Sequence, residues 1–291
     1  MTGAHAENDM KRISFSILAL FVLLPITGCS GLFFYPAREF SESAVVLSFA
    51  PQDIYFRTSD GITLHGWFFQ PPGKALGTVL VMHGNAQNLS THVHSVLWLV
   101  KEGFNLFIFD YRGYGRSEGT PSLDGIHADA EAALETGLSH AGEQGRIVVL
   151  GQSLGGDVAV YAVAHAVNKN RVAALVLESA FAGYRLIARE KLSEFFLTWP
   201  FQYPLSYLID DHYSAVKWID KVSPVPVLVM QGKQDTVVPA HHGRLLFEAA
   251  REPREMWETE APGHIRAFSD NLVRRAFVGY VERKLETNRG Q

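Results

Sequence analysis

The chain has 291 residues, of which 47% are hydrophobic, and it carries a formal net charge of −4 at pH 7. This length favours one domain with a sizeable core and excludes two large domains. Because no run of Lys or Arg follows position 12, nucleic acid is excluded as an expected partner, and the single cysteine excludes an internal disulfide.

An export signal is the first element predicted along the chain. Lys11 and Arg12 precede an apolar run over residues 13–26, which is shorter than the ~20 residues that cross a bilayer. The run ends in Ile26-Thr27-Gly28-Cys29, which resembles the lipobox of bacterial lipoprotein signal peptides. That resemblance implies lipidation of Cys29, whereas the alternative is that Cys29 is a free buried thiol.

The lipobox resemblance also implies boundaries and a location. We predict a lipoprotein-type signal peptide over residues 1–28, a lipidated tether over residues 29–50 and one folded domain over residues 51–291. Lipidated Cys29 would make a membrane a partner and hold the protein at the bacterial cell envelope. By resemblance to enterobacterial lipoproteins, Ser30 after the cysteine favours the outer membrane over the inner membrane.

Strand and helix patterns alternate through the predicted domain. Residues 53–56 and 62–69 read as strands joined by a Ser59-Asp60-Gly61 turn, which predicts a hairpin. Short apolar strands separated by helical stretches follow over residues 79–82, 106–109, 147–150, 174–177 and 227–230. This pattern predicts an α/β fold with a mostly parallel central sheet and helices on both faces.

Gly151-Gln152-Ser153-Leu154-Gly155 is the most informative motif in the chain. It puts a serine between two glycines, directly after an apolar strand and before a helix, as in a nucleophile elbow. The glycines permit a strained turn and close helix–strand packing, which expose the Ser153 hydroxyl. The alternative is that Ser153 is an ordinary helix N-cap.

A serine nucleophile needs a base, and the base needs a carboxylate to orient it. Asp235 lies in the loop after the predicted strand 227–230, and His264 lies between the last predicted strand and the last helix. Asp211 and Asp220 compete with Asp235, but neither follows a strand so closely. Loops at the carboxyl ends of parallel strands gather on one edge, so we expect Ser153, Asp235 and His264 to form a catalytic triad.

The oxyanion formed by attack on a carbonyl needs two backbone donors. The N–H of Leu154, next to the nucleophile, is expected to supply one. The other is expected from His83-Gly84-Asn85-Ala86, after the strand that ends at residue 82, with the Asn85 N–H as candidate and Ala86 next.

Four ordered motifs resemble the α/β-hydrolase superfamily, most closely its ABHD and bud-emergence branch. They are His83-Gly84-Asn85-Ala86, Asp110-Tyr111-Arg112-Gly113-Tyr114-Gly115, Gly151-Gln152-Ser153-Leu154-Gly155-Gly156 and Leu177-Glu178-Ser179-Ala180-Phe181. The resemblance spans roughly residues 50 to 285 and implies an α/β-hydrolase fold and a serine esterase, thioesterase or lipase-like enzyme without a cofactor.

Four further positions carry expectations of their own. The chain departs from the family pattern at Gln87, where glycine is usual, and at Asp157, where a small or apolar residue is common. Asp110 and Arg112 are expected to order the loop after their strand, with Glu178 as a candidate partner.

A cap region is predicted over residues 179–222, where the strand–helix alternation breaks and aromatic residues gather. One interpretation is that these side chains line a pocket for an acyl chain. The other is that they pack the cap helices against the core.

The function expected from these features is hydrolysis of small or lipid-like esters or thioesters through a Ser-His-Asp acyl-enzyme. The alternatives are a serine peptidase of the prolyl-oligopeptidase type and a non-catalytic envelope lipoprotein that uses the fold for binding. No metal site is expected, because the adjacent His241 and His242 would point about 100° apart on a helix and lack a completing ligand set.

Overall fold

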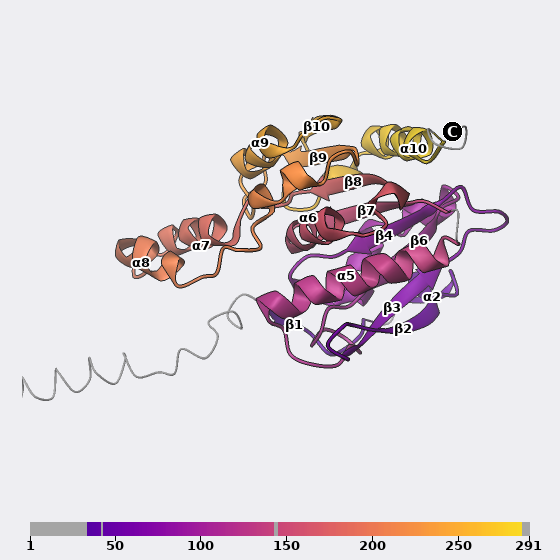
Figure 1. Ribbon diagram of the computed structural model, residues 1–291, viewed down its shortest axis with the longest axis horizontal. Coiled ribbons are helices and arrows are strands. Elements are labelled where there is room, and N and C mark those ends of the chain that lie inside the picture. The colour runs from indigo at the N-terminus through magenta and orange to yellow at the C-terminus, as the bar shows by residue number, and fades with distance from the viewer. Residues whose placement is uncertain (1–33, 42, 143–144, 287–291) are drawn as a thin grey trace, which may run out of the picture.

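The computed structural model describes residues 34–41, 43–142 and 145–286, and its centre is an eight-stranded sheet (Figure 1). In chain order the sheet contains β2 (Gln52–Arg57), β3 (Thr63–Phe69), β4 (Thr78–Met82), β6 (Asn105–Phe109), β7 (Ile147–Gln152), β8 (Val172–Glu178), β9 (Val227–Gly232) and β10 (Arg254–Thr259). Across the sheet they lie in the order β10, β9, β8, β7, β4, β6, β3, β2. The pairs β2–β3 and β3–β6 are antiparallel and the other pairs are parallel, which confirms the mostly parallel sheet.

The longer helices cover the two faces of this sheet. The described helices are α2 (Ala44–Leu47), α3 (Leu89–His92), α4 (Trp98–Lys101), α5 (Leu123–His140), α6 (Leu154–His165), α7 (Tyr184–Ser193), α8 (Gln202–Tyr207), α9 (Ala240–Ala249) and α10 (Asn271–Glu286). One hydrophobic cluster joins α5, α6 and α9 to one face, and a second joins α3, α4 and α10 to the other. No helix in these described stretches is long and apolar enough to cross a membrane.

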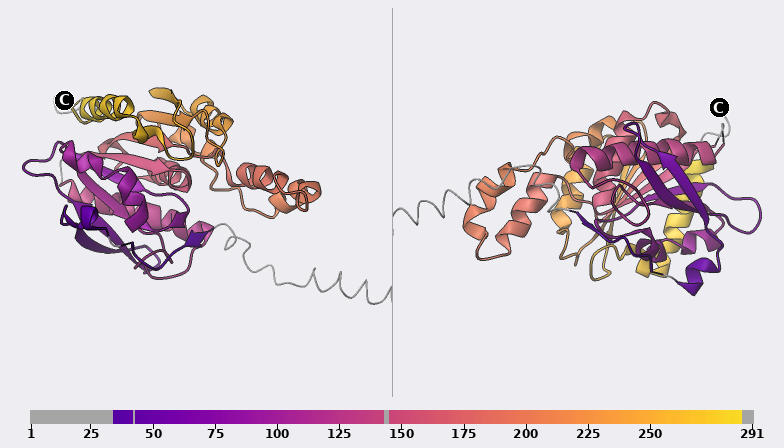
Figure 2. Two further views of the ribbon diagram at one scale, coloured as in Figure 1. Left: turned by 180° about the vertical axis from the view of Figure 1, so that it is seen from behind. Right: turned by 90° about the horizontal axis from the view of Figure 1, so that it is seen from below.

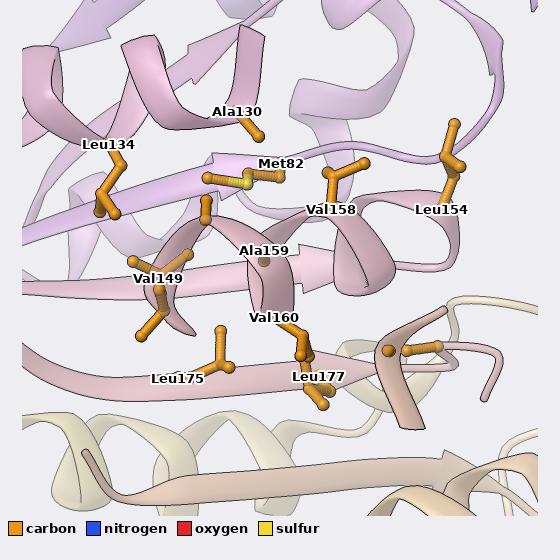
Figure 3. Close-up of a cluster of buried hydrophobic side chains, with 14 of the residues drawn as sticks. Met82, Ala130, Leu134, Val149, Leu154, Val158, Ala159, Val160, Leu175 and Leu177 are labelled. Carbon is orange, nitrogen blue, oxygen red and sulfur yellow. The ribbon is translucent and has the colours of Figure 1, made fainter. Parts of the chain in front are cut away.

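Alternation along the buried strands explains why both faces are covered. In β4, Leu80 and Met82 point into the first cluster, while Val79 and Val81 point into the second. Figure 3 shows Met82 beside apolar side chains of α5 and α6, so the strand is sandwiched between helix layers. Such strands read as continuous apolar runs, which is why the sequence reveals them.

The carboxyl ends of the central strands are level with one another. In the register of the sheet, Gln152 at the end of β7 faces Glu178 at the end of β8, and Glu178 faces Met230 in β9. The loops that follow β4, β7, β8, β9 and β10 therefore gather at one edge, where the candidate site lies.

The described residues of the predicted tether, which precede the domain boundary expected at residue 51, pack with the folded unit. β1 (Tyr35–Pro36) pairs in parallel with β5 (Ala86–Gln87) to form a separate two-stranded sheet. Phe34 is 5% exposed and Val46 is 1% exposed, so both belong to the two cores. The predicted signal peptide and Cys29 lie outside the described residues.

The cap region follows β8 and contains α7 and α8, which project from the body of the molecule (Figures 1 and 2). Its residues Phe196, Trp199 and Tyr207 are between 59% and 79% exposed. These rings do not pack against the core, whereas Phe181 and Tyr184 at the start of the cap region are buried in it, as the packing interpretation expects. The acyl-pocket interpretation stays a prediction.

Candidate active site

Ser153 has the backbone geometry of a nucleophile elbow. It stands between β7 and α6 with φ 54° and ψ −118°, a conformation that strains a residue other than glycine. A Cβ on Gly155 would overlap the carbonyl oxygen of Met82, so this glycine lets α6 approach the end of β4. The Ser153 side chain makes no capping hydrogen bond to α6, which argues against the N-cap alternative.

The structure brings Asp235 and His264 together. His264 Nδ1 lies 2.8 Å from Asp235 Oδ2, and the Asp235 side chain is fully buried. Asp235 Oδ1 accepts hydrogen bonds of 2.9 Å from the N–H groups of Val237 and Val238. Burial raises the pKa of Asp235, but the hydrogen bonds from His264 and Val238 outweigh it, so the pKa lies below its ordinary value. Asp235 is therefore a fixed anion that orients the imidazole.

Ser153 adjoins the histidine loop without a direct hydrogen bond to it in the described residues. A Cβ placed on Gly84 would lie 3.4 Å from Ile265 Cδ1, next to His264, and 3.6 Å from Ser153 Cβ. The three residues predicted for a triad thus lie at one edge, with the acid–base pair formed. Serine–histidine bonds are often loose without substrate and tighten in the reacting complex.

Asn85 and Leu154, the expected oxyanion donors, flank the nucleophile. Leu154 begins α6, where N–H groups have no acceptor within the helix. Asn85 follows Gly84 in a loop held by Tyr114, whose single hydroxyl proton lies within reach of Asn85 O at 2.5 Å and of Asn85 Oδ1 at 2.9 Å. The alternative donor, Ala86, lies opposite Tyr35 in the β1–β5 pair.

The loop that carries Asn85 is braced by a segment that precedes residue 51, the predicted start of the domain. Ala37 N–H donates to Gln87 O at 3.0 Å, and Asn88 Nδ2 donates to Ala37 O at 3.0 Å. Gln87 has φ 66°, which explains why related sequences usually carry glycine here. The pairing with β1 helps to hold this less favourable residue in place.

Glu178 is a buried carboxylate beneath the site whose role the sequence prediction missed. Its Oε2 accepts from Gln152 Nε2 at 2.7 Å, and its Oε1 accepts from Ala267 N at 3.0 Å. Burial raises its pKa to about 7, although the hydrogen bonds from Gln152 and Ala267 act in the opposite direction. Glu178 therefore links the elbow to the histidine loop.

Ser179, the next residue, also supports the site and was not singled out. It has φ 52°, donates to Asp235 and accepts from Ile265 N at 3.4 Å. The signal that could have found both residues is the Leu177-Glu178-Ser179-Ala180-Phe181 motif at the end of a central strand.

The partners expected for Asp110 and Arg112 differ from those found. Asp110 accepts from Leu89 N at 2.7 Å, and Arg112 binds Asp129 at 2.8 Å and Asp60 at 2.7 Å. Both residues order loops, as expected, but Glu178 is not their partner. Arg112 cannot reach the end of β8 while it bridges these two carboxylates.

Asp157 and Asp211 support the base of the cap. Asp157 is fully buried, and its Oδ2 accepts from Ala215 N at 3.1 Å, which ties α6 to the end of the cap region. Asp211 accepts from Ser214 Oγ and Lys217 Nζ. These contacts account for the unusual Asp157 and exclude Asp211 as the triad carboxylate.

Glu190, His241 and His242 form a group with the potential to bind a metal ion. Glu190 lies 2.8 Å from His241 Nε2 and 2.9 Å from His242 Nε2. However, His242 Nδ1 accepts a 3.0 Å hydrogen bond from Ala182 N, so in the neutral ring Nε2 carries the proton. Because a metal ligand must present a lone pair, the group fits a hydrogen-bonded clasp between α7 and α9 better than a metal site.

The fold and the geometry of the elbow at Ser153 are those of an α/β-hydrolase, and known proteins of similar sequence support this class. The family model described as serine aminopeptidase, S33, matches residues 73–211. The protein YfhR of Salmonella typhi is 36% identical and aligned over 98% of this chain and 99% of its own length. The alpha/beta hydrolase domain-containing protein WAV2 of Arabidopsis thaliana is 38% identical, over 70% of this chain and 68% of its own length.

Solved structures match the fold across most of the chain. The esterase Pf2001 of Pyrococcus furiosus has a TM-score of 0.67 and 22% identity, covering 87% of this chain and 98% of its own.

Among the sequence relatives, protein bem46 of Schizosaccharomyces pombe is 32% identical over 67% of this chain and 64% of its own length. The chain belongs to the α/β-hydrolase superfamily.

Proposed function

We propose that the protein is a serine hydrolase that cleaves carboxylic esters or thioesters of small or lipid-like substrates at the bacterial cell envelope. The observation that carries this proposal is the strained Ser153 at the elbow beside a buried Asp235 bonded to His264 at 2.8 Å. A packing role needs neither the strain nor this hydrogen-bonded pair.

The proposed reaction is a two-step acyl transfer. Ser153 Oγ attacks the substrate carbonyl carbon while His264 Nε2 accepts its proton and Asp235 stabilises the imidazolium. The N–H groups of Leu154 and Asn85 bind the oxyanion. His264 then protonates the leaving group, and water, activated by the same imidazole, releases the acid from Ser153.

Labelling with a fluorophosphonate probe tests the nucleophile. We expect the full chain to react and Ser153→Ala to remain unlabelled, with kcat falling on the order of a million-fold. Ser139→Ala, an exposed serine on α5, is the matched control and should label fully. Labelling of a folded Ser153→Ala protein would refute the assignment, and an unlabelled wild type would favour the non-catalytic lipoprotein.

A peptidase is the second candidate, favoured by the S33 aminopeptidase family match over residues 73–211. A panel of acyl esters from two to sixteen carbons, run beside aminoacyl anilides, separates the two. Faster turnover of the anilides would replace the ester assignment.

The envelope location rests on Cys29, and a separate experiment tests it. Metabolic labelling with a fatty acid should mark the wild type and not Cys29→Ser. An unlabelled wild type would remove the lipoprotein assignment and leave the hydrolase proposal intact.

A further inference from the structure

The tip of the cap concentrates apolar surface. Residues 195–201 connect α7 to α8 and include the short 3₁₀ helix η4 (Trp199–Phe201), and five of these seven residues are large and apolar. Their exposed fractions run from 57% for Phe201 to 79% for Phe196. We call this set the cap patch, and it consists of Phe195, Phe196, Leu197, Trp199 and Phe201.

The grouping of exposed apolar residues in the cap patch differs from the distribution of such residues elsewhere in the described chain. Outside the cap, large exposed apolar residues such as Val167 and Leu272 stand as isolated positions in the sequence. Contiguous apolar surface on a monomer marks a binding surface, because covering it gains free energy that scattered residues cannot gain together.

The cap patch lies on the side of the sheet where the described chain begins. The cap leaves the sheet after Glu178, at the carboxyl edge. β1, near the start of the described chain, pairs with β5 just beyond the carboxyl end of β4. Figure 1 shows β1 and the cap on the same side of the sheet, away from the C-terminus.

The length of chain before β1 limits how far the anchor can lie from this edge. Only four residues lie between Cys29 and Phe34, and the five Cα–Cα steps that join the two span at most about 18 Å in an extended chain. A lipid attached to Cys29 would thus hold the site and the cap close to the membrane surface.

The composition of the cap suits a lipid–water interface. Trp and Phe bury their rings at the boundary between headgroups and acyl chains, and Arg and Lys pair with lipid phosphates there. Arg185 and Arg189 lie over the rings of Tyr207 and Tyr203, at 5.0 and 5.3 Å from the ring centroids. The cap therefore combines an apolar tip with cations along its length.

We propose that the cap patch inserts into the surface of a lipid membrane and turns the active-site edge toward it. The membrane contact does not depend on catalysis, whereas the delivery of lipid esters to Ser153 rests on the proposed function. The contact would be a second attachment, distinct from lipidated Cys29.

Quenching of Trp199 by lipid tests the contact directly. The full chain is mixed with phosphatidylethanolamine and phosphatidylglycerol vesicles that contain a lipid brominated in its acyl chains, and Trp199→Phe is measured beside it. The difference between the two proteins isolates Trp199, which we expect to be quenched by the brominated lipid and shielded severalfold from acrylamide. Val167→Ser, 93% exposed elsewhere, should behave as the wild type.

Two results would overturn the proposal. One is Trp199 fluorescence that brominated lipid does not quench and that acrylamide still quenches in the presence of vesicles. The other is that Trp199 is shielded from acrylamide without vesicles and that the protein forms a dimer which Phe196→Ser dissociates. In that case a second copy of the chain would cover the cap patch.

Activity provides the readout for substrate delivery. Phe196→Ser should lower hydrolysis of a long-chain ester embedded in vesicles on the order of tenfold and leave hydrolysis of a soluble acetate ester unchanged. Equal losses on both substrates would contradict delivery through the cap. Absence of activity in the wild type would reject the proposed function, while Trp199 quenching would still report the membrane contact.

Discussion

Replacing Asp235 with asparagine tests whether this carboxylate fixes the tautomer of His264. The carboxylate Oδ1 holds the N–H groups of Val237 and Val238 at 2.9 Å, so the asparagine carbonyl oxygen must keep that position. The opposite orientation would leave two buried donors unpaired at roughly 1–3 kcal/mol each. The asparagine NH₂ therefore faces His264 Nδ1, which must accept, and Nε2 then carries a proton and cannot take one from Ser153.

The expected loss is about 10⁴-fold in kcat, or about 5 kcal/mol in the barrier, with the fold retained. The assay is hydrolysis of a soluble ester, read together with the rate of fluorophosphonate labelling, and both should fall in parallel. Asp220→Asn is the matched control, since Asp220 pairs with Arg251 at 3.4 Å near the surface, away from the site. An Asp235→Asn variant within tenfold of the wild type would refute the tautomer argument.

Three further predictions concern groups around the site. Tyr114→Phe should lower kcat about tenfold because the Tyr114 hydroxyl no longer fixes the position of Asn85, whereas Tyr280→Phe should not, since in the described residues that buried hydroxyl has no hydrogen-bond partner. Equal effects of the two changes on kcat would contradict this. The folded-state pKa of Glu178 is about 7, above its ordinary 4.5, so the wild type should lose stability as pH rises through this window. In urea unfolding at several pH values, Glu178→Gln should therefore gain roughly 3 kcal/mol on the wild type between pH 4 and 8, and a constant difference would contradict the buried titration. Chelators and added Zn²⁺ should leave activity unchanged because His242 presents an N–H to Glu190, and a loss on chelation would overturn that protonation state.

The parts of the site that the sequence predicts are those encoded by short local patterns. Buried parallel strands appear as apolar runs, and the elbow appears as two glycines around Ser153. Asp235 and His264 could be found because each directly follows a strand, and parallel strands bring such loops to one edge. The ends of the strands differ from the prediction: β7 continues past residue 150 to Gln152 because its pairing with β8 continues to Glu178.

Long-range contacts explain what the sequence prediction missed. The loop that carries Asn85 is braced by the hydrogen bond from Asn88 to the carbonyl oxygen of Ala37, 51 residues away, and no local pattern marks that pairing. The sequence offers Glu178 as a candidate partner for Asp110 and Arg112. Only the packed structure shows that Arg112 is satisfied by Asp60 and Asp129.

Aromatic composition alone cannot tell whether a ring is buried or exposed, and the cap illustrates why. Packing against the core and lining a pocket both assume that the sheet lies within reach of residues 195–201. α7 is instead fixed at its side by the Glu190 contacts to His241 and His242, and its far end carries the cap patch outward. Ser153 lies at the carboxyl edge of the sheet, the edge from which the cap leaves β8 and near which β1 pairs with β5. Under the proposed membrane contact, this shared edge would face the surface that holds the ester substrate.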